Sequence, residues 1–428
     1  MKILLVLLDG LGDRSYKELG NRTPLQAAYT PNLDRMAALG SNGLFHASRP
    51  GQCLPSETAH YLMFGYDLKN FPGRGLLEAS GDSVPFDDKD VLCLSHLSGI
   101  TWRDEVPILT HKRDDIKGSF EEIGQLFKAI SPYESNGIKF QLFQIRRNDA
   151  ILVMSGDVSP YVSDSDPIIP GNPMALIKPL SENPEPGKAE QTAKAMNDYL
   201  AYCCNILREH KLGRISRTGF LATQRCGRRI IQEPFRNKWG LNGMLIASES
   251  VYIGLANELG LNALRVTNSD DPGMDLRERI KVALEDKTYD FIHVHTKAPD
   301  ESAHKGDPSG KQETIKLLDK GLDELLDAVT QSDDLLVAVT ADHSTPSRST
   351  LIHSGEPVPL TLVGPNVRRD RVKAFDEIIA GEGCLGSIRG NELMLMLLNY
   401  TDRSALLGHQ LGSFPKFYFP DSYEPFKV

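Results

Sequence analysis

Residues 337–344 read VAVTADHS and decide the fold of this chain. This segment closes an apolar run that begins at Leu335 and ends in an acid and an imidazole, Asp342 and His343. A buried parallel strand delivers side chains in this way to the carboxyl edge of a sheet, where open α/β proteins hold their sites. An Asp beside a His is weak evidence alone, so the rest of the chain must supply matching ligands.

Two other apolar runs end in the same way. Residues 1–8 lead to Asp9, and residues 291–294 lead to Asp300 and His304, which lie four positions apart. Mixed Asp and His ligation suits a pair of divalent transition-metal ions, Zn²⁺ or Mn²⁺, rather than Ca²⁺. We therefore predict a metal centre built from acids and imidazoles that follow predicted strands: Asp9, Asp300, His304, Asp342, His343 and His353.

Composition excludes several classes of function. The chain has 428 residues, of which 40% are hydrophobic and 25% charged, with a net charge of −9. No basic run accompanies this acidic balance, so we do not expect nucleic-acid binding. The first apolar run is too short for a signal peptide and no stretch has the length of a transmembrane helix, so we expect no membrane association. The sequence carries no indication of oligomeric state.

The six cysteines show no metal-type CxxC spacing. We therefore expect reduced thiols in a cytoplasmic protein. The residues concerned are Cys53, Cys93, Cys203, Cys204, Cys226 and Cys384.

A further candidate is Ser56, which follows Pro55 and precedes a stretch of helical character from Glu57 onward. At a helix N-cap the hydroxyl faces unpaired backbone N–H groups and the positive end of the helix dipole. This setting suits an alkoxide that attacks a phosphate, because the dipole stabilises the anion and the amides receive phosphate oxygens. A serine that only caps the helix is the alternative. Arg74, flanked by two glycines, is a candidate phosphate contact.

The pattern of elements changes twice along the chain. From about residue 87, short β-like runs and a Pro-rich stretch precede a long helix at 188–210, whereas strands and helices alternate again after Lys238. Such alternation predicts a mostly parallel sheet with helices on both faces. Its elements include strands at 243–247 and 358–363 and an amphipathic helix at 315–329. We expect a core of residues 1–85 and 239–428, with an inserted α+β domain at 86–238.

The motifs and their order resemble the alkaline phosphatase superfamily and, within it, the archaeal-type branch of the 2,3-bisphosphoglycerate-independent phosphoglycerate mutases. The resemblance rests on Asp9-Gly10, PSETAH at 55–60, DESAH at 300–304, TADHS at 340–344 and His353. It implies an alkaline-phosphatase-like fold with two divalent ions, Mn²⁺ or Zn²⁺, with Mg²⁺ as an alternative. One ion would be held by Asp9, Ser56, Asp342 and His343, and the other by Asp300, His304 and His353. Ser56 would carry the phosphoryl group as a phosphoserine, with the ions stabilising the charge.

The inserted domain would form a lid that holds a small phosphorylated substrate. The chain departs from the branch here, since Ile168 stands where the branch usually has a histidine. Arg74, Arg228 and Arg229 are the candidate substrate contacts. Three functions remain open. The first is interconversion of 2-phosphoglycerate and 3-phosphoglycerate, the second a phosphatase or phosphotransferase acting on another small phosphorylated metabolite, and the third a metal-bound sensor or scaffold.

Overall fold

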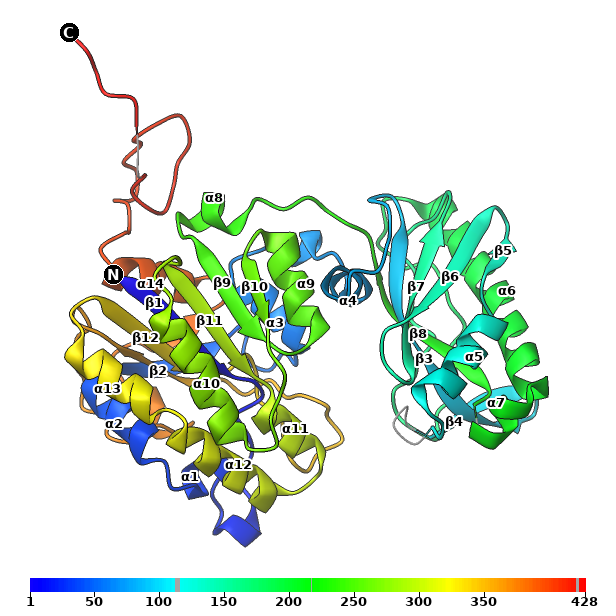
Figure 1. Cartoon of the computed structure of the whole chain (residues 1–428), viewed down its shortest axis with the longest axis horizontal. Helices are drawn as coiled ribbons and strands as arrows, with labels where there is room; N and C mark the ends of the chain where they lie inside the picture. Colours follow the sequence, from blue (N-terminus) through cyan, green and yellow to red (C-terminus); the bar gives the residue numbers. More distant parts are fainter. Residues whose placement is uncertain (112–115, 217, 421–422) are drawn as a thin grey trace. The chain divides into compact units, whose positions relative to one another are not determined.

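The structure is a computed structural model, and it describes residues 1–111, 116–216, 218–420 and 423–428 (Figure 1). The chain forms two compact units, one of Met1–Asn70 with Gln232–Val428 and one of Phe71–Ile231. The second unit is thus an insertion in the first, but its ends differ from the expected 86 and 238. At the first end, helix α4 (Arg74–Gly81) packs on strand β3 (Val91–Arg103) of the inserted unit. At the second, Phe235 and Trp239 are buried in the first unit.

The first unit is built on an eight-stranded sheet. Its strands are, in order, β10 (Asn262–Arg265), β9 (Gly243–Ala247), β11 (Phe291–Thr296), β1 (Lys2–Leu8), β12 (Leu335–Thr340), β13 (Val358–Val363), β2 (Ser41–His46) and β14 (Gly386–Arg389). Neighbouring strands are parallel except at β13, which runs antiparallel to both β12 and β2. The predicted mostly parallel sheet is confirmed, and the predicted bounds of β9 and β13 are met.

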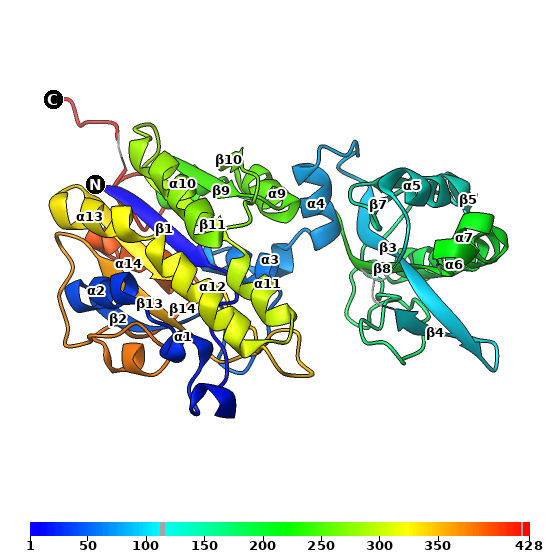
Figure 2. The same cartoon turned by 60° about the horizontal axis from the view of Figure 1, so that its bottom comes forward.

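Helices cover both faces of this sheet. As a result, every residue of β11 and β12 is buried. Helices α10, α12, α13 and α2 contact one another, and Figures 1 and 2 show α10, α12 and α13 along one face. Helix α3 contacts α9 and α14 in a separate group. The helices are α1 (Pro24–Ala27), α2 (Pro31–Leu39), α3 (Ser56–Met63), α8 (Phe235–Trp239), α9 (Ser250–Leu259), α10 (Pro272–Glu285), α11 (Ala298–His304), α12 (Pro308–Lys320), α13 (Asp323–Gln331) and α14 (Glu392–Tyr400), with short 3-10 turns at Lys17–Leu19, Leu68–Asn70 and Ile379–Glu382.

The helix expected at 315–329 is two helices, α12 and α13, which break at Gly321. A side chain at Gly321 would place its Cβ 2.3 Å from the carbonyl oxygen of Gly273 in α10, so the two backbones approach too closely for any other residue. Apolar periodicity continues across the break because both helices pack in the same layer. The pattern alone therefore cannot reveal the interruption.

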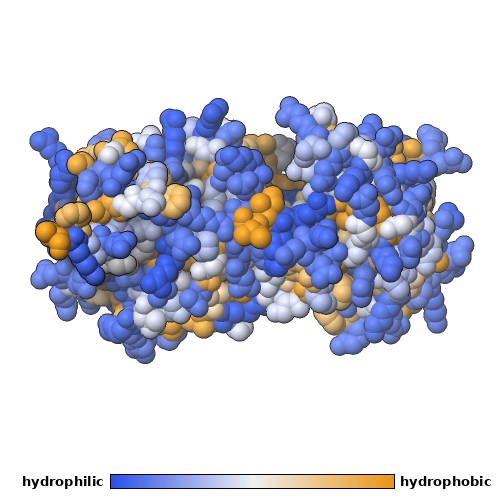
Figure 3. All heavy atoms as spheres, turned by 90° about the horizontal axis from the view of Figure 1, so that it is seen from above, coloured by the Kyte–Doolittle hydropathy of each residue, from blue (hydrophilic) through white to orange (hydrophobic). Residues whose placement is uncertain are grey.

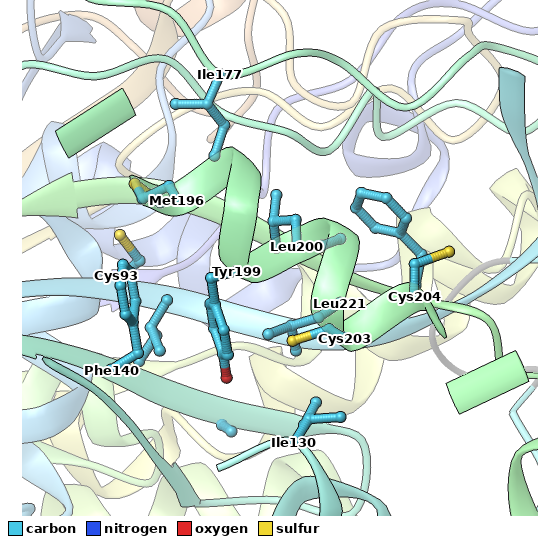
Figure 4. Packing of buried hydrophobic residues seen from close by; sticks show 14 of the residues in the cluster. Cys93, Ile130, Phe140, Ile177, Met196, Tyr199, Leu200, Cys203, Cys204 and Leu221 are labelled. Carbon is cyan, nitrogen blue, oxygen red and sulfur yellow. The ribbon is translucent and has the colours of Figure 1, made fainter. Parts of the chain in front are cut away.

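The second unit is an α+β domain, as expected, and its strands pair antiparallel. Its sheet has the order β4 (Val106–His111), β3, β7 (Asp149–Ser155), β6 (Ile138–Gln144) and β5 (Tyr133–Ser135), with β8 (Phe220–Gly227) paired to β3. Its helices besides α4 are α5 (Phe120–Ala129), α6 (Pro186–Glu209) and α7 (Lys211–Ser216). Helix α6 buries Met196, Tyr199 and Leu200 in the core of this unit (Figure 4), where the rings of Tyr199 and Phe140 stack with centroids 4.7 Å apart.

Two of the six cysteines are not reduced thiols. Cys93 in β3 and Cys226 in β8 form a disulfide between neighbouring antiparallel strands. The prediction of six free thiols is wrong for this pair, because strand pairing joins residues 133 positions apart and short-range spacing cannot reveal it. The other four cysteines, Cys53, Cys203, Cys204 and Cys384, are free.

No helix in the described part of the chain combines the length and the apolar character needed to span a membrane. On the face shown in Figure 3, hydrophilic residues cover most of the surface and hydrophobic residues form separate patches. Inside the first unit, buried polar residues lie at the carboxyl edge of the eight-stranded sheet.

Candidate metal centre

Three adjacent strands, β11, β1 and β12, end level with one another. Leu7 of β1 pairs with His295 of β11 and with Thr340 of β12, so the chain leaves all three strands at the same height. The backbone N–H of Asp9 donates to the carbonyl of Thr296 at 3.0 Å, which extends the pairing by one residue. The register therefore brings together the acids that follow these strands.

The first ligand group consists of Asp9, Asp342 and His343, all buried, with one ligand atom from each within 4.8 Å of the others. The Nε2 atom of His343 lies 3.5 Å from Asp9 Oδ1 and 3.2 Å from Asp342 Oδ2. Among the residues that the structure describes, neither of these two carboxylate oxygens has a hydrogen-bond partner. A buried oxygen without a partner is costly, so the donor set fits a cation.

The second ligand group consists of Asp300, His304 and His353, again with one ligand atom from each within 4.8 Å of the others. Asp300 and His304 lie one helical turn apart on α11 and so share a face. The Nδ1 atom of His353 donates to the carbonyl of Leu54 at 2.7 Å. Because Nδ1 carries that proton, the Nε2 atom of His353, 3.5 Å from Asp300 Oδ1, is left to bind a metal ion.

Ser56 lies beside the first group. It is the first residue of α3, with Pro55 at the N-cap, so the predicted N-cap position is wrong by one residue. Its Oγ donates to His343 Nε2 at 2.9 Å. Thr345 Oγ1 donates to Asp300 Oδ1 at 2.7 Å and lies 3.2 Å from His343 Nδ1, from which it accepts. This chain of hydrogen bonds puts the proton of His343 on Nδ1 and leaves Nε2 as the acceptor.

The electrostatics of the centre reflect burial and close charges. Burial tends to raise the pKa of Asp9, but the ammonium of Lys297 and the hydrogen bond from His295 outweigh it and lower that pKa well below its usual range. Burial, together with the charge of Asp9, raises the pKa of Asp342. Burial also lowers the pKa of His343, which keeps the imidazole neutral. Neutral imidazoles and ionised carboxylates are the forms that bind metal ions, so an ion at this group would favour the ionised form of Asp342 against its raised pKa.

Several residues of the centre are absent from the sequence prediction. Three of them contact Asp9 Oδ2: the Tyr252 hydroxyl at 2.6 Å, His295 Nε2 at 3.0 Å and Lys297 Nζ at 3.2 Å. His60 lies next to Asp342, with 3.6 Å between Nδ1 and Oδ2. The segment HVHTK at 293–297 is a signal, since alternate histidines on a buried strand precede the ligand helix. The sequence holds no comparable signal for Tyr252.

The three candidate substrate arginines belong to the second unit, including Arg74, which was expected in the core. Each pairs with a carboxylate of that unit. Arg74 Nε lies 2.8 Å from Glu78, Arg228 Nη1 3.3 Å from Glu185, and Arg229 Nη1 2.9 Å from Asp88. Their role toward a substrate remains a prediction.

An α/β core that holds two carboxylate–imidazole groups, with a serine at a helix start beside them, has the arrangement of a metal-dependent phosphoryl-transfer enzyme. Comparison with known proteins agrees with this class. The family model described as the Metalloenzyme superfamily matches residues 1–400.

Curated relatives cover nearly the whole chain. The 2,3-bisphosphoglycerate-independent phosphoglycerate mutase 2 of Methanocaldococcus jannaschii is 40% identical over 99% of both chains. The 2,3-bisphosphoglycerate-independent phosphoglycerate mutase of Thermoplasma volcanium is 36% identical over 95% of this chain and 98% of its own. The solved cofactor-independent phosphoglycerate mutase of Thermoplasma acidophilum has a TM-score of 0.59 at 27% identity, covering 94% of this chain and all 100% of its own. A Pyrococcus horikoshii protein has a TM-score of 0.74 at 24% identity, covering 95% and 99%, and shows the same fold. The chain belongs to the metalloenzyme superfamily and, within it, to the family of 2,3-bisphosphoglycerate-independent phosphoglycerate mutases.

Proposed function

We propose that this chain interconverts 2-phosphoglycerate and 3-phosphoglycerate through a phosphoserine at Ser56. The observation that carries the proposal is the 2.9 Å contact between Ser56 Oγ and His343 Nε2, because it places the hydroxyl beside the first ligand group. The relatives that match nearly the full chain at 31–40% identity are named as mutases of this kind.

Two divalent ions complete the proposed centre. Asp9, Ser56, Asp342 and His343 would hold one ion, and Asp300, His304 and His353 the other. When bound, the ions lower the pKa of the serine hydroxyl and stabilise charge on the transferring phosphoryl group. Mn²⁺ and Zn²⁺ suit mixed carboxylate and imidazole ligands, with Mg²⁺ as an alternative.

In the direction from 2-phosphoglycerate, the hydroxyl of Ser56 loses its proton, Oγ attacks the phosphorus, and the bond from phosphorus to the C2 oxygen breaks. The C2 oxygen takes up a proton, and the glycerate stays bound. The C3 hydroxyl then attacks the phosphoserine, loses its proton, and breaks the bond from phosphorus to Oγ. No water is consumed and Ser56 is regenerated. The site must therefore keep the glycerate in and water out until the second step.

We assign this retention to the inserted unit, which would act as a hinged lid, and to Arg74, Arg228 and Arg229. A guanidinium binds a carboxylate or phosphate in a bidentate manner, which suits the grip that a retained glycerate needs. The ion pairs with Glu78, Glu185 and Asp88 orient these arginines. Because its substrates are intermediates of glycolysis, we place the enzyme in the cytoplasm.

One observation favours a second candidate, a phosphatase or phosphotransferase acting on another small phosphorylated metabolite. All three candidate arginines already pair with carboxylates, and a phosphatase, unlike a mutase, does not need to retain glycerate. The purified, Mn²⁺-loaded protein should be assayed with 3-phosphoglycerate beside a generic phosphatase substrate. Formation of 2-phosphoglycerate supports the mutase. Release of phosphate from several esters without isomerisation supports the phosphatase.

A further inference from the structure

Lys297 lies between the two ligand groups. Its ammonium is 3.2 Å from Asp9 Oδ2, in the first group, and 2.9 Å from Asp300 Oδ2, in the second. The side chain is 25% exposed, whereas both carboxylates are buried. Lys297 precedes the first residue of α11 and stands three positions before Asp300, so the same turn places the ammonium and the ligand.

Positive charge is scarce around the acids of the two ligand groups. The two groups bury three carboxylates, those of Asp9, Asp300 and Asp342. Among the described residues, Lys297 is the one lysine or arginine in an ion pair with any of them, since their other partners are imidazoles. An uncompensated buried carboxylate is costly, so this single ammonium matters to both groups.

The ammonium is not needed to orient Asp9. The Tyr252 hydroxyl and His295 Nε2 already reach the same Oδ2 atom at 2.6 and 3.0 Å. Thr345 likewise donates to Asp300 at 2.7 Å. Other donors thus hold both carboxylates in place, and what Lys297 adds is the positive charge of its ammonium.

We propose that Lys297 is a built-in third cation of the centre, shared by both ligand groups. Before ions bind, it balances the charge of Asp9 and Asp300. After two divalent ions bind, three carboxylates, two ions and one ammonium leave two positive charges, which matches the roughly two negative charges of a phosphoryl group at neutral pH. The second half of this inference rests on the proposed function, since it requires an anion at the centre.

The two roles predict opposite effects of removing the charge. An ammonium repels incoming cations, so Lys297→Met should bind Mn²⁺ more tightly, by about tenfold or more. The same variant, loaded with Mn²⁺, should bind inorganic phosphate more weakly by a similar factor. Without ions it should unfold at a lower temperature, because the carboxylates lose their counter-charge. A residue that merely oriented the ligands would weaken Mn²⁺ binding, by roughly 10- to 100-fold.

The test is isothermal titration calorimetry with Mn²⁺ and then with inorganic phosphate, in a Ser56→Ala background where no phosphoryl transfer occurs. Lys297→Gln keeps an N–H donor without the charge, and Lys297→Arg keeps the charge. We expect Lys297→Gln to behave as Lys297→Met does, and Lys297→Arg to behave as the chain with Lys297. Weaker or unchanged Mn²⁺ binding in both neutral variants, or unchanged phosphate binding, overturns it. This test measures binding and not turnover. If the wild-type protein shows no mutase activity but the variants show the expected binding shifts, the proposed function is refuted and this inference stands.

Discussion

The two ligand groups at the sheet edge are built from the same residue types but differ in rigidity. Asp9, Asp342 and His343 directly follow two central strands and are wholly buried. In the second group, Asp300 is buried, but His304 is 43% exposed and His353 comes from a loop. A preorganised, buried set loses less entropy when an ion binds, so the first group should bind its ion more tightly.

The largest effect is expected at Ser56, which joins the first group to the chemistry. Ser56→Ala removes the nucleophile and should lower mutase turnover by roughly 10³-fold or more. Mn²⁺ bound by the second group should be unaffected. Thr58→Ala, which removes a hydroxyl two residues along the same helix, is the matched control and should keep most of the activity. Substantial turnover in Ser56→Ala would mean that water attacks the substrate directly.

The difference between the groups is tested by removing one ligand from each. Asp342→Asn should weaken Mn²⁺ binding at the first group by about 100-fold or more, because it takes an anionic ligand from a buried site. His304→Ala should cost about tenfold, since water can replace an exposed imidazole. Titration calorimetry should show two classes of site in the wild type and the loss of a different class in each variant. Equal losses of Mn²⁺ affinity in the two variants would contradict the proposed difference in rigidity between the two groups.

A smaller effect is expected from the hydrogen bonds behind the first group. Tyr252→Phe removes the 2.6 Å donor to Asp9 Oδ2 without changing the packing of the ring, and should weaken Mn²⁺ binding at that group by roughly tenfold. Tyr66→Phe is the control, because the Tyr66 hydroxyl donates instead to the carbonyl of Glu233. If both variants bind Mn²⁺ alike, the rigidity of the first group comes from burial alone.

The smallest effect concerns a carboxyl group outside both ligand groups. Burial raises the pKa of Glu377 to about 7, against hydrogen bonds and the charge of Lys311. A raised pKa means that the folded chain holds the proton more strongly than the unfolded chain does. The associated stability is therefore present below about pH 4.5 and is lost as the pH rises through about 7. Denaturant unfolding should show a loss of about 3 kcal/mol over this range that is absent in Glu377→Gln.

The ligands themselves were predictable because strand ends are visible in sequence. Asp9 and Asp342 each follow an apolar run, and the parallel register alone brings them together. Asp300 and His304 were found through their spacing of four, which puts them on one face of a helix. For a site at a sheet edge, then, apolar runs and the residues that follow them carry most of the information.

Contacts that depend on packing between distant elements were not predictable. Tyr252 reaches Asp9 from α9, which sits 243 positions away, and nothing in the pattern of α9 marks this residue. The disulfide between Cys93 and Cys226 depends on strand pairing in the inserted unit. The end of that unit was misplaced because α4 continues the first segment in sequence but packs on β3.

The central claim is that Ser56 carries the phosphoryl group between two oxygens of one retained glycerate. The most direct test is to incubate the Mn²⁺-loaded protein with 3-phosphoglycerate in H₂¹⁸O, quench with acid, and analyse protein and products by mass spectrometry. The account predicts phosphate on the peptide that contains Ser56 and 2-phosphoglycerate without ¹⁸O. Inorganic phosphate containing ¹⁸O, with no 2-phosphoglycerate, would contradict it.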